Sequence, residues 1–387
     1  APKSKTVTTQ LLPPVEIQAT KPARRLIQTL PIGIGALAFA AMFFYLLPRT
    51  SPGTFQAGIG MQVGVGLPTE LTMGLFGRLL QDPTPVMRVT LRSSSSGKAY
   101  RVAEPPYLRA RIFDTYYPAR EAGSRQFQAR WGQATTQPFH PSLQTAAAYG
   151  ISDTAVNDMV SVEFDVQREF AAVLCNIPPA YSIEERPGVD LNYDRFNMLL
   201  DPLDPNSKAV GKSLVYFLGS AGFHKNQQLP IYPAYIPGTS ASRKFSQLLS
   251  PLGNFPEADR LRRGILEKQG IAESDKYRAA EAYQNHFVFS GEFKYTLDLR
   301  PPMDSQMDPI EDFIVNQPQG HCQYFAAAMV AMLRQNEIPC RIVVGYRPTE
   351  FNSFGYFRVK QSDADAWVEA LFLREQLIGT EVEPWLS

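Results

Sequence analysis

The longest apolar stretch of the chain runs from Leu26 to Leu47 and holds 22 residues without a charge. A helix rises by about 1.5 Å per residue, so this segment can cross the roughly 30 Å hydrocarbon core of a bilayer. A cleavable signal peptide has an apolar region of only about 7–15 residues, and here a polar tail of 25 residues comes first. The pattern predicts a transmembrane helix over residues 26–48, and a buried core helix is the alternative.

The charges on either side of this segment predict its orientation. Lys21, Arg24 and Arg25 precede it, and only Arg49 follows closely. Basic residues favour the cytoplasmic side, so residues 1–25 are expected to be a cytoplasmic tail and the remainder periplasmic or extracellular. Small residues in the helix suit close contact with other helices. We therefore expect the bilayer and integral membrane proteins as partners, the proteins contacting Leu26–Leu47 and the tail.

Beyond a Gly-rich linker at residues 49–80, the polar and apolar positions alternate in short runs. These runs are rich in Val, Phe and Tyr and end at Pro, Gly or Ser, as strands do; they cover residues 86–91, 108–117, 127–131 and 159–167. They predict an extracytoplasmic β-rich domain at residues 81–225. The Pro- and Ser-containing stretch 226–255 is expected to be a connector.

A helical period replaces the alternation near Pro256. Apolar spacing predicts helices over residues 257–270 and 274–287, with Ser274 as a helix cap, and a short helix over 308–314. A further helix is expected from Cys322 to Arg334, followed by strands at residues 338–346, 356–361 and 364–372. Residues 256–387 are thus predicted to form a second domain, and the fold class is α+β.

Composition excludes several classes of function. The 387 residues carry a net charge of only +1, which gives no reason to expect nucleic acid as a partner. Three cysteines and four histidines are too few and too scattered for a disulfide scaffold or a metal site. The Gly-containing run at residues 58–66 lacks the strand–turn–helix context of a dinucleotide site. We expect neither a cofactor nor a metal.

The residues around Cys322 are typical of a thiol active site. Gly320 permits a tight turn, which places Cys322 at the start of the predicted helix. Amide groups and the helix dipole at that end favour a thiolate over a thiol of ordinary pKa near ~8.5. Cysteine hydrolases and acyltransferases pack such a helix on a sheet that carries the general base. Cys322 is the candidate nucleophile.

The sequence GHCQYFAAAMVAMLRQNEIPCRIVVGY at residues 320–346 resembles the core of the transglutaminase-like superfamily. It has the Gly-x-Cys, the small-residue helix ending in Leu-Arg, and the Ile-Pro-x-Arg strand ending in Gly-Tyr. YFRVKQSDADAWVEALF at residues 356–372 resembles the strand pair that carries the family's Asp-Ala-His-Ala-Trp-Val-Glu. Residues 66–91 and 105–116 are similar to bacterial membrane-anchored members. The resemblance implies a papain-like core, a nucleophile helix packed on an antiparallel sheet.

One departure from this pattern bears on activity, since Asp365 stands at the histidine position. A carboxylate of ordinary pKa near ~3.9 is a poor acceptor for a thiol proton, and its negative charge raises a neighbouring cysteine pKa. The family's third residue, an aspartate on the next strand, has no clear match. We therefore expect a pseudoenzyme that serves as a structural or accessory subunit of a membrane assembly, with peptide binding in the vacant cleft as a variant.

The alternative is an active thiol acyltransferase, a protein-glutamine gamma-glutamyltransferase, or a cysteine peptidase with a displaced base. His321 adjoins Cys322, but successive helical side chains diverge by about 100°, so a rim or capping role is expected. Trp367 and Glu369 share a strand face with Asp365. The two carboxylates predict either a cation site or a pair of carboxylates that is solvated or paired with arginine. Cys175 and Cys340 are expected to be small buried residues.

Overall fold

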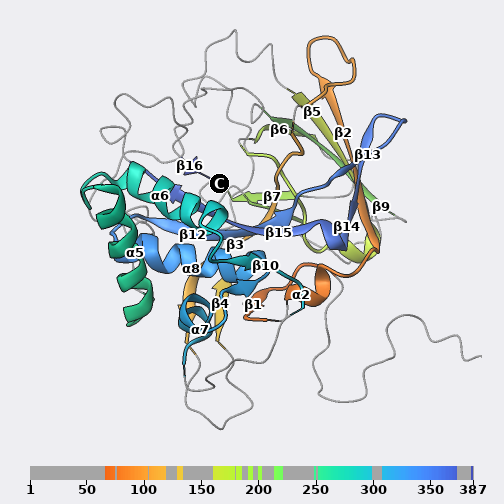
Figure 1. The fold of residues 1–387 in the computed structure, drawn as a ribbon. Helices are drawn as coiled ribbons and strands as arrows, with labels where there is room; N and C mark the ends of the chain where they lie inside the picture. The colour runs from red at the N-terminus through yellow and green to blue at the C-terminus, as the bar shows by residue number, and fades with distance from the viewer. Residues whose placement is uncertain are drawn as a thin grey trace, which may run out of the picture. The chain divides into compact units, whose positions relative to one another are not determined.

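The computed structural model of the chain describes residues 66–74, 76–102, 104–118, 129–133, 160–178, 180–184, 191–194, 199–202, 213–220, 248–249, 252–298, 307–372 and 385–386 (Figure 1). They fall in a unit that runs from Val63 to Ser387. The span predicted over Leu26–Leu47 lies outside the described residues. Within the described ranges, no helix is long and apolar enough to cross a membrane.

The first of two large sheets holds the candidate site. Its six strands are antiparallel and follow the order β1-β4-β3-β12-β15-β16. The bounds are β1 Glu70–Thr72, β3 Leu108–Tyr117, β4 Arg130–Gln133, β12 Cys340–Tyr346, β15 Ala364–Leu371 and β16 Trp385–Leu386.

The second sheet has the order β13-β14-β2-β5-β9-β6 and is also antiparallel. Its bounds are β2 Pro85–Ser93, β5 Val160–Gln167, β6 Ala180–Glu184, β9 Ser213–Ser220, β13 Glu350–Phe351 and β14 Tyr356–Lys360. Two small pairs complete the described strands: antiparallel β7 (Leu191–Asp194) with β8 (Leu199–Pro202), and parallel β10 (Lys294–Tyr295) with β11 (Gln319–Gly320).

Both large sheets combine strands from the two regions that the sequence analysis treated as separate domains. β3 pairs with β12, and β2 pairs with β14. The predicted boundary, with a β-rich domain at 81–225 and a second domain at 256–387, therefore does not separate two folded units. The physical reason lies in β12, which is buried at all seven positions. Such a central strand needs a neighbour on each side; β15 supplies one, and the distant β3 supplies the other.

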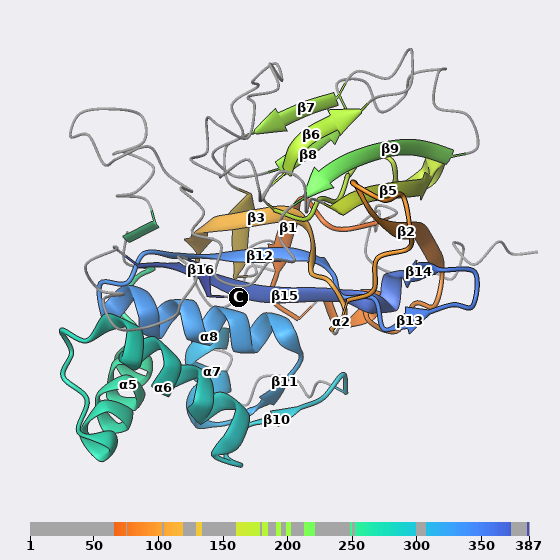
Figure 2. The same cartoon turned by 90° about the horizontal axis from the view of Figure 1, so that it is seen from above.

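Four helices cover one side of the first sheet, and β6 to β9 lie on its other side (Figure 2). The helices are α5 Pro256–Gln269, α6 Lys276–Phe289, α7 Pro309–Val315 and α8 Cys322–Gln335; a short helix α2, Phe76–Leu79, follows β1. The α6 cap is Asp275, whose side chain accepts from the Arg278 N–H, rather than the expected Ser274. The predicted antiparallel sheet with a helix packed on it is confirmed.

Helix α8 is held against the sheet by small side chains and one buried arginine. Ala327, Ala328 and Val330 are fully buried, and their small volume lets the helix approach β12 and β15 closely. At the other end, the Arg334 guanidinium donates to the carbonyl oxygens of Asp114, at 2.7 Å, and Cys340, at 2.9 Å. The middle and the C-terminal end of the helix are thus held against the sheet.

Candidate functional site

Cys322 is the first residue of α8, as the sequence predicted. His321 before it has an extended backbone, with φ −96° and ψ 178°, and Gly320 lies in β11. A Cβ at Gly320 would stand 3.0 Å from three side-chain atoms of Tyr324. Glycine is therefore needed here for close approach to the first turn of the helix, and this approach places the sulfur at the helix N-terminus.

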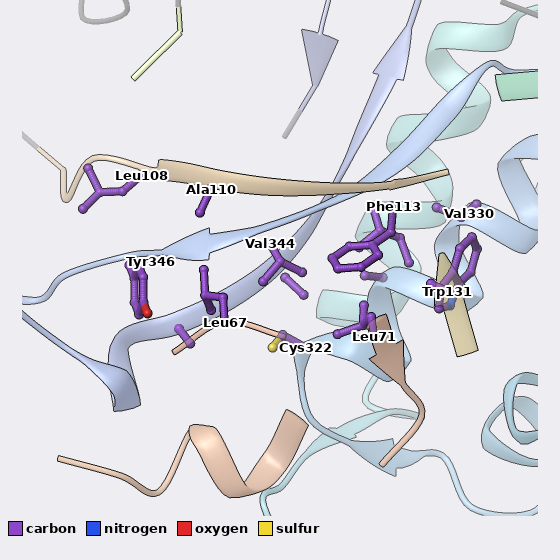
Figure 3. Close-up of a cluster of buried hydrophobic side chains, with 14 of the residues drawn as sticks. Leu67, Leu71, Leu108, Ala110, Phe113, Trp131, Cys322, Val330, Val344 and Tyr346 are labelled. Carbon is purple, nitrogen blue, oxygen red and sulfur yellow. The ribbon is translucent and has the colours of Figure 1, made fainter. Parts of the chain in front are cut away.

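The Cys322 side chain belongs to the buried hydrophobic cluster that also contains Leu71 and Val344 (Figure 3). This burial raises the pKa of the thiol well above its ordinary value, and the negative charge of Asp365 raises it further. The backbone N–H groups of Ala366 and Gln323 lower this pKa, but their effect is smaller than the combined rise from burial and Asp365. The thiolate expected from the helix N-terminus is therefore not favoured, because desolvation outweighs the dipole.

Asp365 lies on β15, beside the Cys322 thiol. A hydrogen bond between the two side chains lowers the pKa of the carboxyl group, whereas burial, the larger effect, raises it. The Asp365 Oδ1 also accepts the Ala366 N–H at 2.8 Å. Arg347 lowers the same pKa electrostatically, but among the described residues no basic nitrogen lies within 4.0 Å of this carboxylate.

Tyr295 is the residue of this site that the sequence analysis did not identify. It lies on β10, which pairs with β11 directly before Cys322, and its ring lies 6.3 Å from that of Phe325. The Tyr295 hydroxyl lies close enough to Cys322 for that residue to affect its pKa, and burial, the largest effect, raises this pKa. No local motif marks Tyr295; the two-residue parallel pairing of β10 with β11 brings it close to Cys322.

His321 is completely buried instead of lying at a rim. Its ring packs against Phe76 and Tyr324, at centroid distances of 6.2 and 5.2 Å, and against Gly77. It is the α8 cap residue, but its side chain makes no capping hydrogen bond. Neither ring nitrogen has a hydrogen-bond partner among the described residues, and burial lowers the pKa of His321 to about 4.

Two other histidines are further candidates for a displaced base. The His286 Nε2 lies 3.6 Å from the Glu292 carboxylate, and its ring packs on Phe287 and Phe293; His224 lies outside the described residues. Neither is placed beside Cys322 by the described structure, so the thiol has no imidazole partner among the described residues.

Trp367 and Glu369 also lie on β15. Trp367 packs on Tyr107 at a ring-centroid distance of 5.0 Å and clusters with Val343. Glu369 is buried and forms salt bridges with Arg109 and with Arg341, the latter at 3.1 Å. Of the two predicted possibilities for this carboxylate, the structure has the arginine-paired one. The described residues contain no group of three or more His, Cys, Asp or Glu side chains that could hold a metal.

All three cysteines are free thiols and buried. Cys175 and Cys340 are surrounded by the hydrophobic core, as expected from their sequence context, and burial raises the pKa of each. Cys322 is the cysteine with a carboxylate and a phenol against it.

Comparison with known proteins shows what this chain is similar to. Residues 266–383 match the transglutaminase-like superfamily core, and residues 8–169 match the TgpA N-terminal domain. The periplasmic domain of TgpA from Pseudomonas aeruginosa has the same fold, with a TM-score of 0.56 and 23% identity over 83% of this chain and 92% of that one.

Two bacterial proteins share sequence with part of the chain. A Pseudomonas aeruginosa protein named protein-glutamine gamma-glutamyltransferase is 40% identical over 106 residues, which are 25% of this chain and 15% of that protein. The Bacillus subtilis protein YebA is 32% identical over 103 residues, which are 25% of this chain and 13% of that protein. The matches thus span less than a fifth of either relative. The chain thus carries one segment that matches the TgpA N-terminal domain and one that matches the core of the transglutaminase-like superfamily.

Proposed function

We propose that this chain is a transglutaminase-like pseudoenzyme, in which Cys322 is a vestigial nucleophile. The observation that carries the proposal is the contact between the Cys322 thiol and the Asp365 carboxylate, at the position where the family has its histidine. Acyl transfer by a thiol requires a base that removes the sulfur proton and returns it to the leaving group. Asp365 does neither well.

The acidities of the two groups support this reading. A carboxyl group is ordinarily a far stronger acid than a thiol, and burial raises the pKa of both side chains here. Transfer of the sulfur proton to Asp365 is therefore unfavourable, because the thiol is the weaker acid of the two. Loss of general acid–base help typically costs about 10²–10⁴-fold in rate, in addition to the low thiolate population.

The proposed role is that of an accessory or structural subunit anchored in a membrane. The uncharged segment Leu26–Leu47 with its basic N-terminal flank supports a single span with an extracytoplasmic C-terminal part. Similarity to a domain described as periplasmic agrees with that side. Extraction in mild detergent followed by native electrophoresis tests the role. Co-migration with other membrane proteins is expected, and a lone monomer in its micelle would contradict it.

An active thiol acyltransferase is the second candidate. The similarity to a protein named protein-glutamine gamma-glutamyltransferase favours it, together with the retained cysteine at the helix N-terminus. In this reading the base would be a group outside the described residues.

Incorporation of an amine probe into a glutamine-containing protein separates the two candidates. We expect no incorporation by the full chain and none by Asp365→Asn, which removes the charge but supplies no base. Asp365→His restores an imidazole and is expected to give incorporation that Cys322→Ala abolishes. Incorporation by the unaltered chain that disappears in Cys322→Ala would establish the enzyme instead.

A further inference from the structure

The hairpin of β13 and β14 projects from one end of the second sheet (Figure 1) and ends in a turn with an exposed phenylalanine. Phe354 is 87% exposed, more than any other large apolar side chain that the structure describes. Phe351, just before the turn, is 48% exposed, and its ring packs against Phe357 at a centroid distance of 4.9 Å. Residues 351–355 are called the hairpin tip below. Exposed apolar groups that gather in this way indicate an interaction site.

The backbone of the hairpin tip is ordered by Asn352. Its side-chain oxygen accepts the backbone N–H groups of Phe354, at 3.0 Å, and of Tyr356, at 3.3 Å. Its carbonyl oxygen accepts the Gly355 N–H at 3.1 Å, and Gly355 has a φ of +88°, which glycine adopts without strain. Because the turn is already formed, docking of Phe354 loses little conformational entropy.

Basic side chains lie at the same end of the second sheet. β14 is antiparallel to β2, with Tyr356 opposite Thr90, so the hairpin tip and the loop after β2 project in the same direction. Arg92 and Lys98 flank that loop and are exposed, and the Arg88 guanidinium lies over the Tyr356 ring at 5.3 Å. Among the described residues, no carboxylate oxygen lies within 4.0 Å of a side-chain nitrogen of these three residues, which are called the basic cluster below.

Nearby acidic side chains do not cancel this charge. Glu350 on β13 pairs with Lys360 and lies 4.0 Å from Arg358, and β5 contributes Glu163 and Asp165. With the basic cluster included, β2, β5, β13, β14 and residues 94–98 carry five basic side chains and three acidic ones. The surface beside the hairpin tip is therefore net positive.

The small size and the charge of this surface favour a bilayer over a protein as its partner. A specific protein interface buries about 800 Å² on each side, whereas two aromatic side chains bury only about 300–500 Å². A bilayer needs no matching surface, because apolar side chains enter its interface and basic side chains contact the phosphate groups of its lipids.

Building on the membrane-anchored role proposed above, we propose that the hairpin tip is a second membrane contact, which enters the interface of an anionic bilayer while the basic cluster contacts lipid headgroups. Such a contact is weak by itself. Residues 48–65, which follow the predicted span, reach at most about 60 Å when fully extended. In a chain anchored by Leu26–Leu47 the contact is therefore intramolecular, and a weak contact is populated at a high effective concentration.

The proposal is tested by tryptophan fluorescence of the full chain reconstituted in phosphatidylglycerol vesicles, some of whose lipids carry brominated acyl chains that quench on contact. Phe354→Trp places the probe at the hairpin tip, and subtracting the unaltered protein removes the emission of its three tryptophans. We expect the brominated lipids to quench at least about half of the added emission. Phe289→Trp is the matched control, since Phe289 ends α6 and is 77% exposed; about a tenth or less of its emission is expected to be lost. No quenching at position 354, or equal quenching at both positions, would overturn the proposal.

The contribution of the basic cluster is tested with the double variant Arg92→Gln, Lys98→Gln in the Phe354→Trp background. Each basic residue near an anionic surface strengthens binding roughly fivefold, so the variant is expected to need a larger fraction of phosphatidylglycerol for half-maximal quenching. Vesicles of neutral phosphatidylcholine are expected to quench less than anionic ones. Equal quenching in both lipids, with no effect of the double variant, would refute the headgroup contact.

Extraction with alkaline carbonate distinguishes failure here from failure of the anchored role. Carbonate releases proteins held only at the surface of a bilayer, so retention of the chain in the vesicles reports on the predicted span alone. Retention without quenching at position 354 would refute the hairpin contact and leave the anchored role standing. Release by carbonate would refute the anchored role, and the quenching recorded before extraction would then decide the hairpin contact by itself.

Discussion

The sulfur of Cys322 is controlled by its immediate surroundings more than by the helix that carries it. The amides at the α8 N-terminus favour a thiolate, yet burial and the Asp365 carboxylate raise the pKa of the thiol. Because thiolates and not thiols are alkylated, the reactivity of Cys322 is a direct measure of this balance.

Asp365→Asn is expected to accelerate alkylation of Cys322 by iodoacetamide at pH 7.5 by roughly tenfold for each unit by which the cysteine pKa falls. The charge that disfavours the thiolate is removed, while burial remains. Peptide mass spectrometry of the modified cysteine gives the rate, and Glu350→Gln serves as the unaffected control. Rapid alkylation of the unaltered protein near pH 6 would mean that some other group stabilises the thiolate.

His321 makes a second residue-scale prediction, which concerns acid stability. Its pKa is about 4 in the folded protein, against an ordinary 6.5. Between these values the unfolded chain binds more protons than the folded one, so this residue lowers stability as the pH falls from about 6.5 to about 4. At about 1.4 kcal/mol per pKa unit, this loss in the free energy of unfolding amounts to roughly 3 kcal/mol.

His321→Phe, which keeps an aromatic ring between Phe76 and Tyr324, is expected to remove this contribution. Buried carboxyl groups whose pKa is raised, such as Asp308 and Glu311, change the stability in the opposite direction as the pH falls. The quantity to compare is therefore the difference in free energy of unfolding between His321→Phe and the unaltered protein. Denaturant unfolding at pH 7 and pH 4.5 measures it. An identical pH dependence in both proteins would show that His321 titrates normally.

At the scale of elements, the contact between β3 and β12 joins the two halves of the chain. The register of this pair shifts between Val344 and Gly345, and a Cβ at Gly345 would lie 1.8 Å from the Leu108 carbonyl oxygen. Only glycine allows the two backbones to approach so closely, which is typical of a glycine at a bulge.

Gly345→Ala is therefore expected to destabilise the protein by several kcal/mol, on the order of 2–4, because backbone must move to admit the methyl group. Gly264→Ala is the matched control. Gly264 lies inside α5, and nothing stands within 4 Å of its added Cβ, so the change is expected to stabilise by roughly 0.5–1 kcal/mol. Thermal unfolding midpoints of both variants give the comparison. A tolerated alanine at position 345 would contradict the tight β3–β12 approach.

At the scale of the whole molecule, the arrangement relative to a membrane is the property to test. Protease added to intact spheroplasts is expected to degrade the part of the chain after Pro48, because the basic flank of Leu26–Leu47 favours a cytoplasmic N-terminal tail. Immunoblotting with an antibody to residues of the C-terminal half reads out the result, and a cytoplasmic protein monitors cell integrity. Protection of the C-terminal half in intact spheroplasts would reverse the orientation.

The sequence determined those features that depend on local pattern. The start of α8 at Cys322 follows from Gly320 and the helical spacing after it, and the Ala-rich face predicts close packing on a sheet. Asp365 could be assigned to the histidine position because the Trp-Val-Glu motif beside it fixes the strand register. The sequence pattern also identified four of the six strands of the first sheet and three of the six of the second, since side-chain direction alternates along any strand.

Only the tertiary structure decided which distant segments meet. The pattern in β3 and β12 shows that each is buried but not that they pair, so two separate domains were predicted where the sheets are shared. Tyr295 joins the site through a two-residue pairing that leaves no sequence motif. Burial set the protonation of Cys322 and His321, and the degree of burial depends on every element packed around a side chain. Local pattern therefore identified the chemical groups, and non-local packing determined their acidity and their partners.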